Sequence, residues 1–375
     1  MFADCLLSQR QRIVHVSVFG NDADDCGAIG KPCRTIAVAA SRVASGGIIM
    51  LNGTGAEQRP FDCKKPITWH QRGIWIRRNV TITSLDLTRA CIRCLTGFHF
   101  YRSNRDLRVS LAGITFLETP LRFKDCFEIT LINCTHQNAK EAVTVRSTNT
   151  STANLTIRGS LFQNNSLCVK IQFFEGSGTD LKFSLDIKDT KFLKNGFLDH
   201  FKTLFRGAVE FSNEGNLFRK IYPSIAVEKV RSADSGGHFL KIDLPTAITS
   251  EKYDDVVLER NNFDFSQRKS RSLYFSRVLR ARVTFDRLQC KDNYQVMCVK
   301  IDGRTNATVF VRVHDSCFHN NSAYQADKLW SAIFRVVGSE GHSGNVTISN
   351  TLFVKNNLTA IGKIGRASCR ERVCQ

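Results

Sequence analysis

The amino-acid sequence predicts an all-β protein, a right-handed parallel β-helix of about ten coils with a short N-terminal capping helix. Two observations lead to this fold class. An apolar-x-apolar segment recurs along the chain, followed five residues after its second apolar position by Phe or a substitute, and often by Asn three residues later. The chain also contains 27 Phe but only 6 Pro among 375 residues, so a large apolar side chain is available for many copies.

Four copies follow the pattern fully. They are strand 155–157 with Phe162 and Asn165, strand 185–187 with Phe192 and Asn195, strand 311–313 with Phe318 and Asn321, and strand 346–348 with Phe353 and Asn356. Strand 283–285 has Cys290 in the Phe position, and looser copies fall at 80–87, 109–116, 129–136, 225–232 and 256–263. The copies are spaced by about 20 to 40 residues, the period of a solenoid.

Strand geometry explains why such short units would stack. An apolar-x-apolar strand points two side chains to one side and one to the other, and alone it buries too little surface to persist. In stacked coils the same position recurs about every 4.8 Å, so inward Ile, Val, Leu and Phe form continuous columns. Asn is expected at a turn, where it tolerates left-handed backbone and its amide can bond locally or to the Asn one coil away.

A second short strand often follows the Asn. Segments 166–172 and 296–302 are nearly superimposable, which puts Cys168 and Cys298 in one position. Helical repeats are disfavoured because the apolar period is two and β-branched residues dominate. The alternative of a β-sandwich is disfavoured by the fixed five-residue step from the strand to Phe.

The opening of the chain carries a recognisable series of residues. Asn21-Asp22, Pro32-Cys33, Thr35-Ile36 and Gly46-Gly47 occur in that order. The series resembles the N-terminal signature of the pectate-lyase-like superfamily of secreted β-helix proteins, and the resemblance implies a strand, a short helix and the first coil. Thr35 would cap a helix over 36–44, closed by Gly46-Gly47, and this helix would cover the exposed strand edges. We expect one β-helix domain over 14–362, with its N-terminal cap at 14–47.

Both ends of the chain are expected to depart from the natural protein. Residues 364–373 resemble the conceptual translation of a common sequencing-library adapter, so we expect 363–375 to be an artefact. Residues 1–13 lack the apolar region and cleavage site of a secretory signal, and we expect this N-terminus to be incomplete. A membrane anchor is expected, if at all, only in the missing C-terminal part.

Two features indicate an extracellular or cell-surface glycoprotein. Chance predicts about three or four Asn-x-Ser/Thr sequons at this composition. The chain has more, beginning at Asn52, Asn79, Asn133, Asn149, Asn154, Asn164, Asn306, Asn320, Asn345 and Asn357. Of its 14 Cys, only Cys369 and Cys374 lie in the expected artefact, and the even remainder suits disulfides in an oxidising compartment.

The cysteine spacing suggests several structural bridges. Cys26 and Cys33 are the first expected pair, with Cys63 as the rival partner. Cys126 and Cys134 have the same separation as Cys290 and Cys298, which suggests a clip within one coil in each case. Cys91 and Cys94 form an isolated C-x-x-C, for which a disulfide or separate bridges are favoured over zinc or redox chemistry. No cofactor is expected.

The charge balance is strongly basic, with 53 Lys plus Arg against 34 Asp plus Glu and a formal net charge of +19. Part of the excess is concentrated in one stretch containing Arg268, Lys269, Arg271, Arg277, Arg280 and Arg282. Aligned on a β-helix face, these side chains would form a stripe for an acidic polysaccharide. The alternative is a set of scattered solvated charges. No nucleic-acid partner is expected, because no recognition module accompanies the charge.

The resemblance to the pectate-lyase-like superfamily also implies an enzyme alternative, a secreted polysaccharide lyase or glycoside hydrolase. The superfamily's galacturonan hydrolases carry Asn-Thr-Asp, Asp-Asp and Gly-His-Gly on successive coils, whereas this chain has only the isolated Asp24-Asp25, Asp254-Asp255 and Gly236-Gly-His238. The outward Thr, Lys, Arg and Ser positions do not suit the calcium of a pectate lyase. His99, His136, His314 and His319 are expected to pack in coils or lie on the surface. We therefore expect no catalytic or metal-binding residues.

The Phe-x-x-Asn recurrence has a second resemblance, to bacterial polymorphic outer-membrane adhesins and to secreted animal proteins with similar β-helices. The excess of sequons favours the animal type. The function we expect is adhesion or recognition by a non-catalytic ectodomain, with an acidic polysaccharide or a cell-surface protein as partner.

Overall fold

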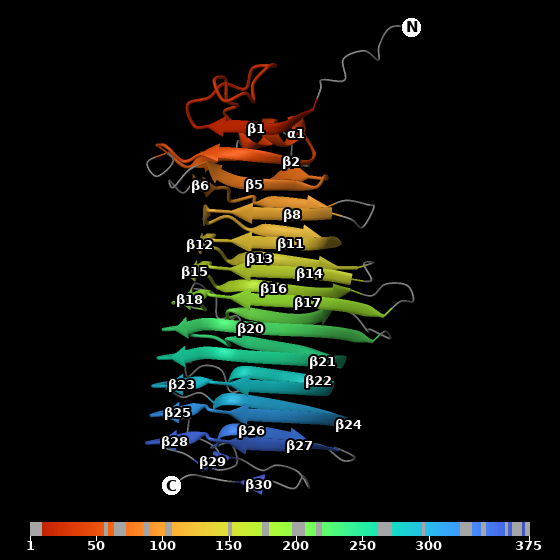
Figure 1. The fold of residues 1–375 in the computed structure, drawn as a ribbon, viewed down its shortest axis with the longest axis vertical. Coiled ribbons are helices and arrows are strands. Elements are labelled where there is room, and N and C mark those ends of the chain that lie inside the picture. Colours follow the sequence, from red (N-terminus) through yellow and green to blue (C-terminus); the bar gives the residue numbers. More distant parts are fainter. Residues whose placement is uncertain are drawn as a thin grey trace.

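The computed structural model describes residues 10–55, 59–63, 73–85, 90–101, 107–148, 152–174, 180–196, 207–214, 220–261, 272–294, 297–322, 332–338, 343–356, 359–361 and 370–371. The pairings between the named strands are parallel, and each strand pairs with its equivalents one coil away. The coils stack along the long axis of the molecule, with β1 and β27 at opposite ends (Figure 1). The predicted parallel β-helix is confirmed. Within the described residues no helix is long and apolar enough to cross a membrane.

The coils have three faces, which we call A, B and C in chain order. Face A contains β1 (Gln11–Ser17), β2 (Val43–Asn52), β5 (Val80–Leu85), β8 (Leu107–Ala112), β11 (Cys126–Ile132), β14 (Thr152–Arg158), β17 (Leu181–Lys188), β27 (Ser343–Ser349) and β30 (Arg370–Glu371). Face B contains β3 (Phe61–Asp62), β6 (Ala90–Arg93), β9 (Ile114–Leu117), β12 (Thr135–Gln137), β15 (Leu161–Gln163), β18 (Lys191–Leu193), β23 (Gln289–Lys291), β25 (Cys317–His319) and β28 (Leu352–Val354).

Face C contains β4 (Ile74–Ile76), β7 (Phe98–Tyr101), β10 (Leu121–Lys124), β13 (Glu141–Ser147), β16 (Leu167–Phe174), β19 (Val209–Glu214), β26 (Ala332–Gly338) and β29 (Thr359–Ile361). Four longer strands turn from one face to the next: β20 (Ile221–Ala233), β21 (Leu240–Glu259), β22 (Ser272–Asp286) and β24 (Met297–His314).

The strand register confirms the four full copies of the sequence repeat and corrects two looser ones: Ile92 and Leu258, rather than residues 87 and 263, lie in the Phe position. Leu155 pairs with Leu185 and Ile157 with Ile187 on face A, and Phe162 pairs with Phe192 on face B. The inward side chains of all three faces are buried in one hydrophobic core. The core is therefore a set of columns that run along the axis, as expected.

The Phe position forms an aromatic column inside face B. Phe116, His136, Phe162 and Phe192 stack in sequence, with ring centroids 4.9, 4.7 and 5.1 Å apart. Farther along, Cys290 pairs with Phe318, whose ring stacks on that of Phe353 at 4.8 Å. Offset stacking of this kind stabilises beyond the burial of area alone.

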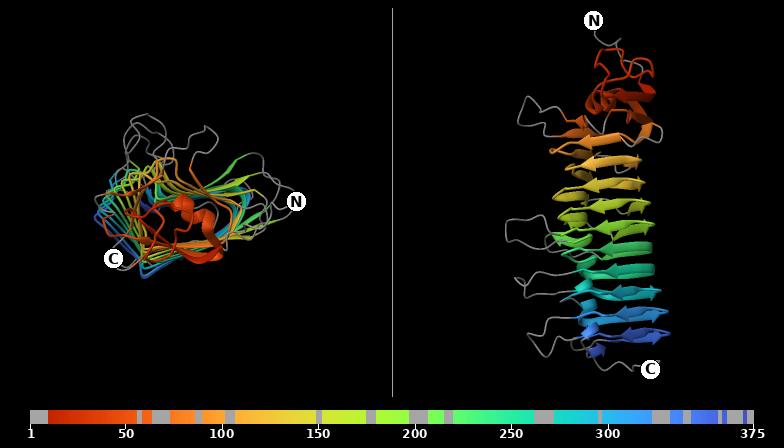
Figure 2. Two further views of the ribbon diagram at one scale, coloured as in Figure 1. Left: turned by 90° about the horizontal axis from the view of Figure 1, so that it is seen from above. Right: turned by 90° about the vertical axis from the view of Figure 1, so that its left-hand side faces the viewer.

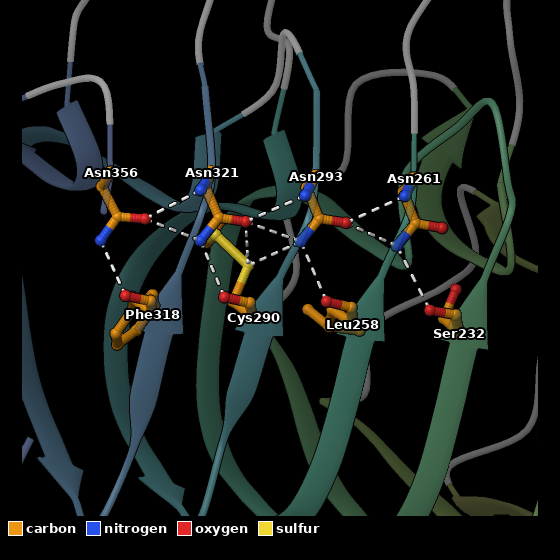
Figure 3. The surroundings of a disulfide bond; sticks show 9 residues. Ser232, Leu258, Asn261, Cys290, Asn293, Phe318, Asn321 and Asn356 are labelled. Carbon is orange, nitrogen blue, oxygen red and sulfur yellow. Dashed lines mark hydrogen bonds between the residues drawn. A yellow bond between two sulfur atoms is a disulfide. The ribbon is translucent and has the colours of Figure 1, made fainter. Parts of the chain in front are cut away.

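The Asn that follows the Phe position forms a buried hydrogen-bond ladder (Figure 3). Each ladder Asn donates through Nδ2 to the carbonyl of the Phe-position residue one coil earlier, as Asn293 does to Leu258 at 2.9 Å. Its Oδ1 accepts from the backbone N–H of the preceding ladder residue, as Asn293 accepts from Asn261 at 3.0 Å. The ladder contains Asn165, Asn195, Asn261, Asn293, Asn321 and Asn356, with Ser235 in the place of one Asn. This confirms the expected bond to the Asn one coil away.

The left-handed backbone lies one residue earlier than expected. The residues just before the ladder, such as Asn164 and Asn320, have φ of 55° and 49°, whereas the ladder Asn residues are absent from the positive-φ set. A second left-handed corner, between faces A and B, recurs at positions such as Asn133 and Asp189. There the N–H of Asn133 donates to the carbonyl of Arg158 in the next coil. Each corner thus turns the chain and also joins adjacent coils.

The N-terminal cap is close to the prediction. Helix α1 (Ile36–Arg42) packs on β1, β2 and β4 and lies across the end of the coil interior (Figure 2). Thr35 is its N-cap and accepts from the Val38 N–H at 3.3 Å. The predicted C-terminal end was wrong: the helix ends at Arg42, because Val43 is already extended and begins β2, and the Gly46-Gly47 pair lies within that strand.

Three disulfides are present in the part of the chain that the structure describes. Cys26–Cys33 and Cys290–Cys298 are as expected, and Cys63 pairs with Cys94. The predicted Cys126–Cys134 clip is not formed. The reason is that β11 separates these two cysteines as a straight strand of about 20 Å, whereas the chain turns a corner between Cys290 and Cys298.

Candidate functional site

The outer side of face C carries columns of polar and aromatic side chains. Strand alternation buries Phe98 and Phe100 of β7 and turns His99 and Tyr101 outward. The register then aligns His99 with Arg122 and Tyr101 with Lys124 one coil on. The next two coils add residues at the same outward positions, Thr144, Arg146, Lys170 and Gln172, of which Thr144 and Gln172 are buried.

We call the first part of this surface the basic strip, defined by Trp75, His99, Tyr101, Arg122, Lys124, Arg146 and Lys170. The rings and cations of the strip lie against one another. Trp75 stacks on His99 at 4.5 Å between centroids, and the Lys124 ammonium lies 5.0 Å from the centre of the Tyr101 ring. Cations so placed are attracted by the ring faces.

The positive charge of the basic strip is only partly compensated. Lys170 approaches Glu141 at 3.6 Å, but among the described residues Arg122, Lys124 and Arg146 form no ion pair. Burial lowers the pKa of Arg122, the nearby carboxylate of Glu141 opposes this, and the charge of Arg146 lowers the pKa further. Burial also lowers the pKa of His99, with a further contribution from Arg122, which leaves the imidazole neutral at pH 7. The strip thus concentrates cations that repel one another, which is how an anion-binding surface is built.

Farther along face C the outward charges neutralise each other. Lys241 pairs with Glu210 at 3.0 Å, and Arg277 pairs with Asp243 at 3.5 Å. Asp302 lies on the other side of Arg277 in the register, so the arginine stands between two carboxylates. This part of the face therefore has little net charge to offer a polyanion.

The sequence-predicted cationic stretch is divided by the fold. Arg277 lies on face C, whereas Arg280 and Arg282 are exposed on face A, because β22 turns from one face to the other between Val278 and Arg280. Arg268, Lys269 and Arg271 lie outside the described residues. The structure does not bring the described members onto one surface.

The described sequons lie on face A and at the corners. Asn52, Asn79, Asn154 and Asn345 lie within or beside strands of face A, and Asn133 lies at the corner between faces A and B. The corner between faces B and C carries Asn164 and Asn320. Asn149 and Asn357 lie outside the described residues, and the side chain of Asn306 in β24 does as well.

The isolated hydrolase-like residues do not converge. Asp25 pairs with Lys31 in the cap, Asp254 pairs with Arg287 on face A, and the partly buried His238 lies in hydrogen-bond contact with the Ser272 carbonyl. Among the described residues no group of three His, Cys, Asp or Glu side chains could hold a metal ion. The four single histidines differ: His136 is in the core, and His99, His314 and His319 are only partly exposed on the outer surface.

Sequence reasoning missed the basic strip. Its members are the outward residues of the face C strands. Segments of variable length separate these strands along the chain, so the members show no fixed spacing in the sequence. Aligning 98–101, 121–124 and 142–146 on their inward residues would have placed His99, Arg122 and Thr144 in one column, because the register pairs them directly.

The comparisons with known proteins are sparse. No protein-family model matches the chain, and no curated protein matches it in sequence. A solved structure described as a rhamnogalacturonan lyase is similar, with a TM-score of 0.40 and 9% identity over 96% of this chain and 86% of that chain. A similarity this low carries no argument about activity, so the fold assignment rests on the strand register.

Proposed function

We propose that this protein is an extracellular glycoprotein that recognises acidic polysaccharides through the basic strip and does not catalyse their cleavage. The observation that carries the proposal is a set of cations that form no ion pair among the described residues: Arg122 and Lys124 on one coil and Arg146 on the next coil of the same face. Each coil advances by about 4.8 Å, so the strip presents positive charge at regular intervals along the axis.

The chemistry of the strip suits a sulfated or carboxylated sugar. A guanidinium can hold a carboxylate or sulfate through two parallel hydrogen bonds, and Arg146 keeps its side chain exposed for such a contact. The partly exposed ring of Trp75 offers a flat apolar surface beside these cations. Together they provide both charge and stacking for a saccharide chain.

The extracellular part of the proposal is supported by three disulfides, at Cys26–Cys33, Cys63–Cys94 and Cys290–Cys298. Disulfides persist in oxidising compartments and are rare in the cytosol. The ten sequons fit the same compartment.

The non-catalytic part is supported by the surroundings of the acidic residues on face C. Asp243 and Asp302 lie two coils apart, about 9.6 Å along the axis. A hydrolase with carboxylates this far apart needs a water molecule between them. Here Arg277 occupies the register position between the two carboxylates and pairs with Asp243.

The test is binding of heparin and of a uronic-acid polymer by protein secreted from eukaryotic cells. The triple variant Arg122→Gln/Lys124→Gln/Arg146→Gln should bind at least tenfold more weakly at 150 mM salt, because it loses about three ionic contacts. Its matched control is Lys182→Gln/Lys252→Gln/Arg312→Gln, which removes the same charge from exposed positions on face A. We expect the control to change affinity less than threefold.

Two results would contradict the proposal. Equal losses in the two triple variants would mean that binding reflects net charge alone. Release of unsaturated products or reducing ends from an acidic polysaccharide would favour the lyase or hydrolase alternative instead.

A further inference from the structure

We propose that N-glycans cover face A and the corners of the coils, and that the basic strip on the outer side of face C is kept free for a polysaccharide lying along the axis. This inference rests on the function proposed above, and it adds which side is open and how the ligand lies. It follows from the placement of the sequons relative to the three faces.

Among the described residues, no strand segment of face C contains a sequon asparagine. Face A contains Asn52, Asn154 and Asn345, and Asn79 comes directly before β5. Alternation turns the Asn154 side chain outward, because Ala153 and Leu155 on either side are buried. Glycans on face A would therefore project into solvent away from face C.

Face B is narrow and bordered on both sides. Its strands of about three residues span roughly 10 Å, with sequons at Asn133 on one corner and at Asn164 and Asn320 on the other. N-glycans are bulky, so those at the two corners would overhang face B. Face C also has sequons toward both edges, with Asn164 and Asn320 at the corner with face B and Asn306 in the part of β24 between faces C and A, but its longer strands leave the basic strip between these edges.

The local geometry is compatible with attachment through Nδ2. Toward the described residues, Asn52 and Asn79 use only Oδ1 in side-chain hydrogen bonds, accepting from the backbone N–H groups of Thr54 and Arg108 at 3.0 Å. Asn133 and Asn320 are exposed at left-handed corners, and the Nδ2 of Asn320 donates to Asp292 in an exposed hydrogen bond that a glycan would replace. The strip itself runs across five coils in a line with the axis, which fits an extended polymer better than a compact ligand.

The test adds a glycan to each side of the molecule. Arg146→Asn creates a sequon over 146–148 in the basic strip, and Lys182→Asn creates one over 182–184 at an exposed position on face A. Tyr101→Asn creates a second face C sequon over 101–103. The charge and side-chain controls are Arg146→Gln, Lys182→Gln and Tyr101→Gln, and mass spectrometry of glycopeptides reports occupancy in every variant.

We expect each face C glycan variant to bind heparin at least tenfold more weakly than its matching Gln variant. Enzymatic deglycosylation should restore the affinity of the Gln variant. The face A glycan should change affinity less than twofold. In the wild-type protein, the sequons on face A and at the corners are expected to carry N-glycans.

Three results would overturn the inference: equal binding with and without the face C glycans, equal blocking by the face A glycan, or native sequons that carry no glycan. Failure of Arg146→Asn and Tyr101→Asn to accept glycans in folded protein would also overturn it, because an open face is accessible. Wild-type protein that binds no acidic polymer would instead contradict the proposed function, and the occupancy map would still test the glycan arrangement.

Discussion

The imidazole of His136 lies parallel to the ring of Phe162, with 4.7 Å between centroids and 5° between planes. Phe116 stacks on its other side at 4.9 Å. His136 is fully buried, and neither ring nitrogen has a hydrogen-bond partner among the described residues. It therefore sits in an apolar position that its neighbouring coils fill with Phe.

The position of His136 predicts a pH-dependent stability. Burial lowers the pKa of His136 from 6.5 to about 3, so the unfolded chain binds a proton that the folded chain does not. The folded state should lose about 2 kcal/mol between pH 7 and pH 5 from this group alone. His136→Phe should remove that loss and raise the urea midpoint at both pH values. A variant with the same pH dependence as wild type would contradict this account.

The Asn ladder predicts a large cost for removing one member. Asn293→Ala would leave the Leu258 carbonyl and the Asn261 N–H unpaired in the core, because Asn293 bonds to both. The expected loss is about 2–4 kcal/mol, from one or two unsatisfied buried groups. The control is Asn345→Ala on the exposed side of face A, expected to change stability by less than about 0.5 kcal/mol. Urea unfolding of unglycosylated protein measures both.

Glu251 predicts a second pH dependence of opposite sign. Its Oε2 accepts from Tyr253 and Tyr274 at 2.6 and 2.7 Å, and its Oε1 has no partner among the described residues. Burial raises the pKa of Glu251, so the folded state keeps its proton while the unfolded chain releases it. Stability from this group is therefore present at low pH and lost as pH rises above the ordinary carboxyl range.

Glu251→Gln should accordingly be more stable than wild type at pH 7, by about 1–3 kcal/mol, and equal to it near pH 4. Unfolding midpoints at the two pH values measure the difference. Equal midpoints for Glu251→Gln and wild type at pH 7 would show that the buried carboxyl group does not destabilise the folded state at this pH.

The disulfide arrangement predicts which thiols can be alkylated. Cys126 and Cys134 should react with a maleimide only after unfolding, because both are buried and donate to backbone carbonyls of their own coils or the coil before. Peptide mapping without reduction should recover the Cys63–Cys94 and Cys290–Cys298 cross-links. Recovery of a Cys126–Cys134 peptide would contradict the structure.

The sequence predicted the core columns well because the repeat itself encodes them. A residue such as Phe162 recurs with a fixed offset from its strand, and that offset survives loops of any length elsewhere in the coil. The Cys63–Cys94 pair was harder to predict from cysteine spacing alone. It follows from the pairing of Phe61 with Ile92, which places the two cysteines on adjacent coils.

The candidate site was less predictable for the opposite reason. Outward residues need no common chemistry, so nothing in the pattern marks Arg122 and Arg146 as neighbours of Lys124. The arginines that lie close together in the sequence are placed on two different faces, because β22 turns from face C to face A between Arg277 and Arg280. Proximity along the chain is a poor guide to a shared surface in a coiled fold.

The substitution of Ser at two places in one coil has a consequence for opening motions. Ser232 stands in the Phe position and Ser235 in the Asn position of the same coil. The Ser235 hydroxyl accepts from the Asn195 N–H, but it donates to Ala233 of its own coil rather than to a carbonyl of the coil before. Two interior columns are thus weakened at one level. Adjacent coils should therefore separate most easily at this level, far from the ends of the stack. Backbone amides of this coil should exchange with deuterium earlier than those of the coils on either side.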